Sequence, residues 1–268
     1  MDLDGIFNAV MIEEFCITSA ASSHVGRKRS NNEDSYIVWE PKDRDILLQK
    51  GRLYAIADGM GGRAAGEVAS QLAIQVLINE YVKHPGTVPE ALAYAVLQAH
   101  HSVLNKARAD ASLNGMGTTL TAMALIDGVA CFAHVGDSRA YLIRKNTIRQ
   151  KTSDHSVEMI TNRDEVITKG VKPRIRRALT QAIGGQNAPR VEVTVFPLQD
   201  GDKILLCSDG LYSVVEDEII LQIAAQKRPD WAVLKLIDLA NEQGGPDNVT
   251  VLIIKIKRPW LRALIGSR

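Results

Sequence analysis

The chain has 268 residues, of which 46% are hydrophobic and 24% are charged, and its formal net charge is +1. This length and composition are typical of one large globular domain with a sizeable buried core. The near-neutral charge argues against a general attraction to nucleic acid or to an anionic membrane surface. No apolar run approaches the roughly 20 residues that a membrane helix needs, so we expect no stable membrane insertion.

Two features of the chain bear on its location. Residues 1–14 are interpreted as a short N-terminal leader, and their first residues are acidic where a secretory signal would be basic. The three cysteines (Cys16, Cys131 and Cys207) are far apart and form no CxxC pair, so we expect buried free thiols. Buried thiols fit a reducing compartment, and we expect a cytoplasmic monomer.

The first half of the chain predicts two strands and then two helices. Residues 36–39 and 53–57 are strand-like, and the second run ends at Asp58. Apolar residues at helical spacing predict a helix over 66–81. A capping box that begins at Thr87 predicts the start of a second long amphipathic helix.

The next part of the chain changes to strand-like runs at 118–126, 129–135 and 139–144. The short links between them, 127–128 and 136–137, predict antiparallel hairpins. An α+β fold follows, with two antiparallel sheets covered by separate pairs of helices.

Two more strands are predicted at 203–207 and 249–256. A helix over about 230–241 lies between them, with Asp230 as its expected cap. The polar segment 155–185 has no clean period and is interpreted as a mobile flap with some helix, inside a domain that spans 15–256. Residues 257–268 are interpreted as a C-terminal tail.

Five short acidic segments stand out, and four of them lie where an apolar strand begins or ends. They are Asn32-Glu33-Asp34, Ala57-Asp58-Gly59-Met60-Gly61-Gly62, Gly136-Asp137-Ser138-Arg139, Ser208-Asp209-Gly210 and Gly245-Pro246-Asp247-Asn248. Carboxylates gathered at one rim would repel one another, and Mg²⁺ or Mn²⁺ would compensate because these ions prefer oxygen ligands. A single Asp-Gly is more often a turn, but five such segments favour a metal-dependent phosphate-ester hydrolase built around Asp58, Asp209 and Asp247.

Arg29 lies just before the first acidic segment. A guanidinium beside a metal cluster can hold a phosphate in a bidentate grip. Because Arg29 belongs to the basic run 27–29, an ordinary surface arginine is an equally good reading of this residue alone.

Together these motifs resemble those of a known family, in its order. They are Gly26-x-x-Arg29-x-x-Asn32-Glu33-Asp34, Ala57-Asp58-Gly59-Met60-Gly61-Gly62, Gly66-Glu67-x-Ala69-Ser70, Gly117-Thr118-Thr119, His134-x-Gly136-Asp137-Ser138-Arg139, Leu179-Thr180-x-Ala182-Ile183-Gly184, Ser208-Asp209-Gly210-Leu211 and Asp247-Asn248-Val249-Thr250. The chain resembles the bacterial metal-dependent protein phosphatases (PPM, type 2C class) over about 25–256. The resemblance implies a four-layer α-β-β-α sandwich with two Mn²⁺ or Mg²⁺ ions between the sheets, and a third, weaker ion site.

The resemblance also implies roles for particular residues. Asp58 would bridge the two ions, and the Gly59 carbonyl would join it. Asp209 and Asp247 would bind the first ion, Glu33 the second, and Asp137 with Asp209 the third. Asp34 and Asn248 would lie behind these ligands, and Arg29 would hold the substrate phosphate.

The implied activity is hydrolysis of phosphoserine and phosphothreonine in proteins by a water that bridges the two ions. The implied partners are phosphorylated proteins, namely a bacterial serine/threonine kinase and its targets, in signalling. Some single-domain relatives act with a kinase in type VI secretion; the layout permits this role, but no residue establishes it.

The chain departs from the family pattern at several positions. Met60 and Arg63 stand where relatives carry histidine, so the proton donor is unassigned, and Gln181 stands where many carry arginine in the flap. His24 and His134 are the nearest candidate donors, although a structural role is favoured for His134.

Two alternative functions remain at this point. One is a pseudophosphatase that only binds, although every acidic motif position is filled. The other is a carboxylate two-metal nuclease, against which the near-neutral charge argues.

Overall fold

The computed structural model describes residues 15–61, 65–160, 175–226 and 228–258. The predicted leader, Arg63 and residues 259–268 of the tail lie outside these ranges. The strands are β1 (Cys16–His24), β2 (Asp34–Trp39), β3 (Arg52–Met60), β4 (Gly117–Thr118), β5 (Leu120–Ile126), β6 (Val129–Val135), β7 (Arg139–Arg144), β8 (Thr147–Gln150), β9 (Ser156–Ile160), β10 (Ile175–Leu179), β11 (Glu192–Pro197), β12 (Lys203–Cys207) and β13 (Val249–Lys257). The helices are α2 (Arg44–Lys50), α3 (Ala65–Lys83), α4 (Val88–Ala109), the 3-10 turn η1 (Ala111–Leu113), α6 (Asp209–Tyr212), α7 (Asp217–Ala224) and α8 (Pro229–Glu242).

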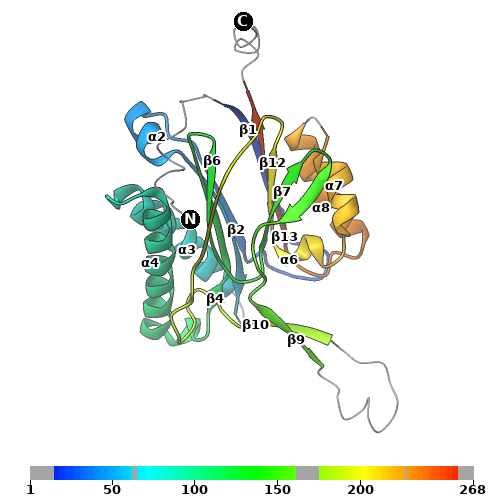
Figure 1. The fold of residues 1–268 in the computed structure, drawn as a ribbon. Helices are drawn as coiled ribbons and strands as arrows, with labels where there is room; N and C mark the ends of the chain where they lie inside the picture. The colour runs from blue at the N-terminus through cyan, green and yellow to red at the C-terminus, as the bar shows by residue number, and fades with distance from the viewer. Residues whose placement is uncertain (1–14, 62–64, 161–174, 227, 259–268) are drawn as a thin grey trace, which may run out of the picture.

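Two antiparallel sheets face each other in the centre of the molecule. One has the strand order β1-β13-β12-β7-β8 and the other β11-β6-β5-β3-β2, with β4 paired to β3. Helices α3 and α4 cover the outer face of the second sheet, and α7 and α8 cover the first (Figure 1). The predicted α-β-β-α sandwich is therefore confirmed.

Burial explains why the central strands are apolar throughout. Every residue of β5 and β6 is buried, because helices cover one face of their sheet and the other sheet covers the opposite face. One apolar cluster fills the space between α3, α4 and their sheet, another lies between the two sheets, and a third lies under α7 and α8. These layers hold the strand ends in a rigid arrangement.

The two links after β5 differ in kind. The hairpin at 127–128 is confirmed, and Asp127 and Gly128 both have the positive φ of a tight turn (48° and 72°). The link at 136–137 is not a hairpin, because β6 pairs with β5 and β11 whereas β7 pairs with β12 and β8. The chain crosses here from one sheet to the other, which brings Asp137 to the rim between them.

Several predicted boundaries also differ. Strand β3 continues past Asp58 to Met60, since Gly59 pairs with Thr118 of the separate short strand β4. Helix α8 begins with Pro229 in its first turn and Arg228 as the N-cap, so Asp230 lies inside the helix and does not cap it.

The described part of the flap is a two-stranded ribbon of β9 and β10. It contains no helix within 155–160 or 175–185, so the helix expected in the flap is not found among its described residues. Figure 1 shows this ribbon projecting from the end of the sandwich where β4 and β10 lie. Its loop, residues 161–174, lies outside the described residues.

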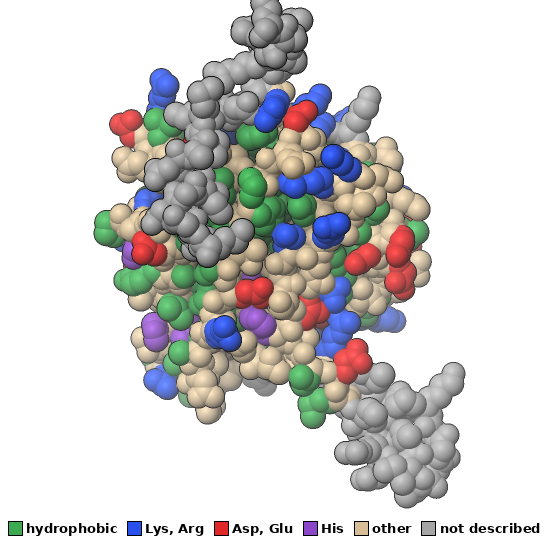
Figure 2. Space-filling model, viewed as in Figure 1, with side chains coloured by type: hydrophobic (Ala, Val, Ile, Leu, Met, Phe, Trp, Pro, Cys, Tyr) green, Lys and Arg blue, Asp and Glu red, His purple; other side chains and the backbone are tan. Residues whose placement is uncertain are grey.

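The cysteines and the charged side chains of the surface also bear on the expectations from sequence. Cys131 and Cys207 are buried free thiols, but Cys16 is exposed on the edge strand β1, so the expectation of three buried cysteines is wrong. Acidic and basic side chains are intermixed on the face shown in Figure 2. Among the described residues, no helix has the length and apolar character needed to cross a membrane.

Candidate metal centre

The acidic segments come together at one end of the sandwich, in an open cavity of about 290 Å³ between the two sheets. Asp58 lies near the end of β3, Asp137 in the crossing link, Asp209 at the start of α6 and Asp247 just before β13. The cavity is lined by Arg29, Glu33, Asp58, Gly59, Met60, Gly61, Thr119, Asp137, Arg177, Leu179, Asp209 and Asp247. Carboxylates that are distant in sequence thus line one cavity, where their oxygens could bind a metal ion.

The main chain at Asp58 is fixed from one side. Its N–H donates to the Thr119 hydroxyl (2.9 Å), and its carbonyl accepts from the Thr119 N–H (2.9 Å) and from the Thr118 hydroxyl (2.9 Å). Asp58 therefore projects from backbone that can move little.

Glu33 is positioned by groups from both ends of the chain. Its N–H donates to the Asn248 side chain (2.8 Å), and the Asn248 amide donates in turn to the carbonyls of Val25 and Asn31. The Glu33 carboxylate packs on the first turn of α3, where a Cβ on Gly66 would lie 2.7–2.9 Å from it. Only glycine leaves this space, and burial raises the pKa of Glu33.

Asp34 lies behind the cavity wall. One of its carboxylate oxygens accepts from Ser208 (2.8 Å) and from Thr250 (2.6 Å). The other oxygen is buried and has no hydrogen-bond partner among the described residues. Burial raises the pKa of Asp34 to about 6.

The cluster is electrostatically unbalanced. Burial raises the pKa of Asp58 well above its usual value, and the nearby carboxylates of Asp34 and Asp209 raise it further. Burial and the charges of Asp137 and Asp247 raise the pKa of Asp209 to about 7. A divalent cation would relieve this repulsion, and an all-oxygen donor set suits Mg²⁺ or Mn²⁺. The residues present therefore fit the metal ions that the sequence predicts.

Arg29 lies at the mouth of this cavity. Its guanidinium donates to the Asp247 carboxylate at 2.8 Å, and about half of its side chain (52%) is exposed. That hydrogen bond raises the pKa of Arg29. The arrangement leaves N–H donors free to meet an anionic group that enters from solvent.

The candidate proton donors do not line the cavity. His24 is exposed, and its Nδ1 accepts from the Gly26 N–H (2.9 Å). His134 is buried, its ring nitrogens meet the Thr121 hydroxyl (2.8 Å) and the Ser153 carbonyl (3.1 Å), and burial lowers its pKa to about 4. The favoured structural role of His134 fits these contacts.

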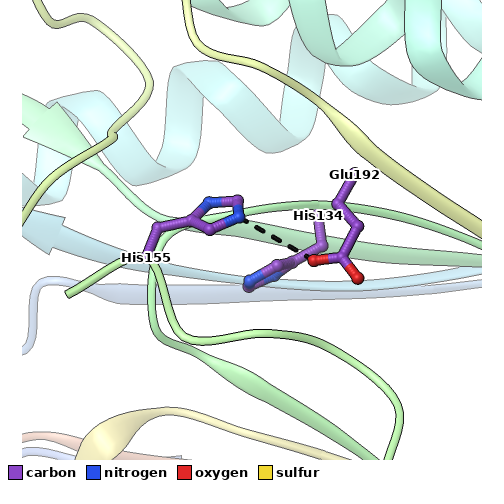
Figure 3. A group of neighbouring side chains, drawn as sticks. All are labelled: His134, His155 and Glu192. Carbon is purple, nitrogen blue, oxygen red and sulfur yellow. Dashed lines mark ion pairs between the residues drawn. The ribbon is translucent and has the colours of Figure 1, made fainter.

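Figure 3 shows that His134, His155 and Glu192 lie together beside the crossing link. His155 Nε2 is 3.8 Å from the Glu192 carboxylate, and His155 Nδ1 accepts from the Gly136 N–H at 3.2 Å. The His155 backbone N–H also donates to the Gly136 carbonyl (2.7 Å). Because both hydrogen bonds between His155 and Gly136 join the start of the flap to the crossing link, they brace the link that carries Asp137.

Sequence reasoning missed one cavity residue, Arg177 of β10. The only signal was the basic run 174–177, since the flap lacks a period that would orient its side chains. Gln181, the flap position singled out by the sequence, does not line the cavity; its side chain accepts from the Arg190 N–H at 2.7 Å.

Comparisons with known proteins agree with this site. Residues 22–233 match the family model for protein phosphatase 2C. The serine/threonine phosphatase stp of Listeria welshimeri is 35% identical over 238 residues, which is 86% of this chain and 92% of that protein.

Solved structures show the same fold. The catalytic domain of the serine/threonine protein phosphatase PstP, in complex with two manganese ions, superimposes with a TM-score of 0.73 at 35% identity, covering 91% of this chain and all of that one. PppA, a key regulatory component of the type VI secretion system in Pseudomonas aeruginosa, has a TM-score of 0.72 at 28% identity, covering 90% of this chain and 97% of that one. The chain belongs to the protein phosphatase 2C family of metal-dependent serine/threonine phosphatases.

Proposed function

We propose that this chain hydrolyses phosphoserine and phosphothreonine in proteins with two Mn²⁺ or Mg²⁺ ions. The observation that carries the proposal is the convergence of Glu33, Asp58, Asp137, Asp209 and Asp247 on one cavity. Their mutual repulsion needs a compensating cation. The phosphatase relatives, and the two manganese ions in the PstP structure, support this assignment.

The proposed roles are those that the family resemblance implies for residues that line this cavity. Asp58 and the Gly59 carbonyl would hold both ions, Asp209 and Asp247 the first, Glu33 the second, and Asp137 with Asp209 a weaker third. Asn248 and Asp34 would support the ligands without lining the cavity. Asn248 accepts a hydrogen bond from the Glu33 N–H, and Asp34 accepts hydrogen bonds from the hydroxyls of Ser208 and Thr250.

The chemistry divides between the ions and the chain. When bound, the ions supply an activated water and neutralise charge on the phosphoryl oxygens. Arg29 holds the phosphoryl group through its free N–H donors, and its contact with Asp247 fixes the guanidinium at the cavity mouth. Thr118 and Thr119 keep Asp58 from shifting as the substrate binds.

The wider setting is also a proposal. The substrates are a serine/threonine kinase and its targets, and the enzyme acts as a cytoplasmic monomer through a domain of residues 15–256. The similarity to PppA supports control of type VI secretion as one such setting. Deleting the gene would then raise phosphorylation of secretion-system proteins in quantitative phosphoproteomics, and unchanged phosphorylation would exclude that setting.

One assay tests the activity itself. Phosphate release from a phosphothreonine peptide and from p-nitrophenyl phosphate is measured with Mn²⁺, with EDTA, and in Asp209→Asn. We expect release with Mn²⁺ and loss of activity in both other cases, whereas Asp238→Asn, an exposed change on α8, should keep full activity. Activity that persists in EDTA would refute the metal mechanism. If no phosphate is released with any divalent cation, a protein that only binds phosphoproteins would be favoured.

A further inference from the structure

Arg177 is a cavity residue without a role in the reaction described above. It lies on β10, at the base of the flap, and lines the same cavity as Asp58 and Asp209. Arg177 is exposed, and Figure 1 shows β9 and β10 projecting from the body of the molecule. Arg177 therefore stands where the flap meets the active site.

The guanidinium of Arg177 is held less closely than that of its neighbour Arg139. None of the ion pairs found among the described residues includes Arg177. Its guanidinium lies over the Tyr212 ring, 5.3 Å from the centroid. Arg139, by contrast, lies 3.7 Å from the same ring and is also held by two hydrogen-bonding nitrogens on Asp154. An arginine that only stacks on a ring can reorient toward an incoming anion.

Arg29 and Arg177 act on different parts of the cavity. Arg29 is bonded to Asp247. Arg177 instead lies over the ring of Tyr212, whose hydroxyl donates to the Asp137 carbonyl at 2.8 Å, so it lines the cavity beside Asp137. A phosphoryl group held by Arg29 therefore leaves Arg177 to meet the part of the substrate that continues past the phosphorylated residue.

We infer that Arg177 is a specificity residue that binds an acidic side chain next to the phosphorylated residue of the substrate. The inference rests on the proposed phosphatase function. The flap residue Gln181 cannot take this role, because its side chain accepts a hydrogen bond from the Arg190 N–H and does not line the cavity. Arg177 provides the positive charge that Gln181 lacks.

The test compares two phosphothreonine peptides that differ only in Glu or Gln residues flanking the phosphothreonine. The readout is the ratio of kcat/KM for the Glu peptide to kcat/KM for the Gln peptide. A partly exposed ion pair corresponds to a preference of about fivefold. We expect that ratio in the wild type, a ratio near one in Arg177→Ala, and an inverted preference in Arg177→Glu. The control Arg149→Ala, an exposed change on β8, should keep the wild-type ratio.

The outcomes separate the two proposals. A wild type that releases phosphate from neither peptide nor from p-nitrophenyl phosphate would refute the phosphatase function. A wild type that cleaves both peptides without preference, or an Arg177→Ala variant that keeps the preference, would overturn the role of Arg177. Inversion in Arg177→Glu cannot come from misfolding, because a damaged site would lose activity on both peptides alike.

Discussion

Replacing Asp209 with asparagine should stabilise the metal-free protein while it abolishes activity. Burial and the neighbouring carboxylates raise the pKa of Asp209 from 3.8 to about 7. In the folded protein without metal, this carboxyl group is therefore about half ionised at pH 7 and mostly ionised at pH 7.5, where its charge is unfavourable. Asparagine has a similar shape and carries no charge, so the repulsion disappears.

The size of the effect follows from linkage. The folded-state pKa lies above the unfolded-state pKa, so the penalty is absent below about pH 4, grows as pH rises to about 7, and is constant above. Each pKa unit corresponds to about 1.4 kcal/mol. The variant should thus gain as much as about 4 kcal/mol in free energy of unfolding at pH 7.5, and about 2 kcal/mol at pH 5.

Urea unfolding in EDTA at both pH values measures this gain. Asp238→Asn, which changes an exposed carboxylate on α8, serves as the matched control and should gain nothing. Saturating Mn²⁺ should reverse the order of stability, because the wild type then gains the binding free energy that the variant lacks. A variant that is no more stable than the wild type at pH 7.5, or whose gain does not shrink toward pH 5, would refute the reasoning.

Three further substitutions test separate parts of the site. Arg29→Ala should lower kcat/KM for a phosphopeptide about 10- to 100-fold in steady-state kinetics, because charge-assisted hydrogen bonds to the phosphate are lost. The control is Arg27→Ala, a change at an exposed neighbour, and an equal loss in that variant would contradict the prediction. Gly66→Ala places a methyl group 2.7 Å from the Glu33 carboxyl carbon and should weaken Mn²⁺ binding in calorimetry; unchanged affinity would argue against Glu33 as a ligand. His134→Leu should lower the free energy of unfolding by about 1–3 kcal/mol, because buried polar groups lose their hydrogen-bond partner. It should leave the dependence of kcat/KM on pH unchanged. Loss of the decrease in kcat/KM on one side of that pH profile would instead identify His134 as a proton donor.

Much of the fold was predictable because burial leaves a direct trace in sequence. The fully buried strands β5 and β6 are continuous apolar runs, and the capping box at Thr87 is present in the structure with Glu90. The acidic segments were recognisable because each is flanked by glycine or by a strand end. Their assembly into one cavity follows from the sandwich, which places these ends at one rim.

Other features depend on contacts that local sequence does not encode. The link at 136–137 has the chemistry of a tight turn, and only the pairing of β7 with β12 shows that it joins two sheets. Helix α2 was missed because it is short, although Asp43 caps it and Gly51 ends it with positive φ. Arg177 could not be singled out within a basic run, since its place depends on how the flap meets the body.

The central claim is that Asp58 bridges two metal ions at this site. Calorimetric titration of the metal-free protein with Mn²⁺ tests it most directly, with Asp58→Asn measured beside the wild type. We predict that the wild type binds two tight Mn²⁺ ions per chain and releases protons from the carboxyl groups whose pKa is raised, and that Asp58→Asn loses both binding events. Binding of both ions by Asp58→Asn with wild-type affinity, or no tight binding by the wild type, would contradict the account.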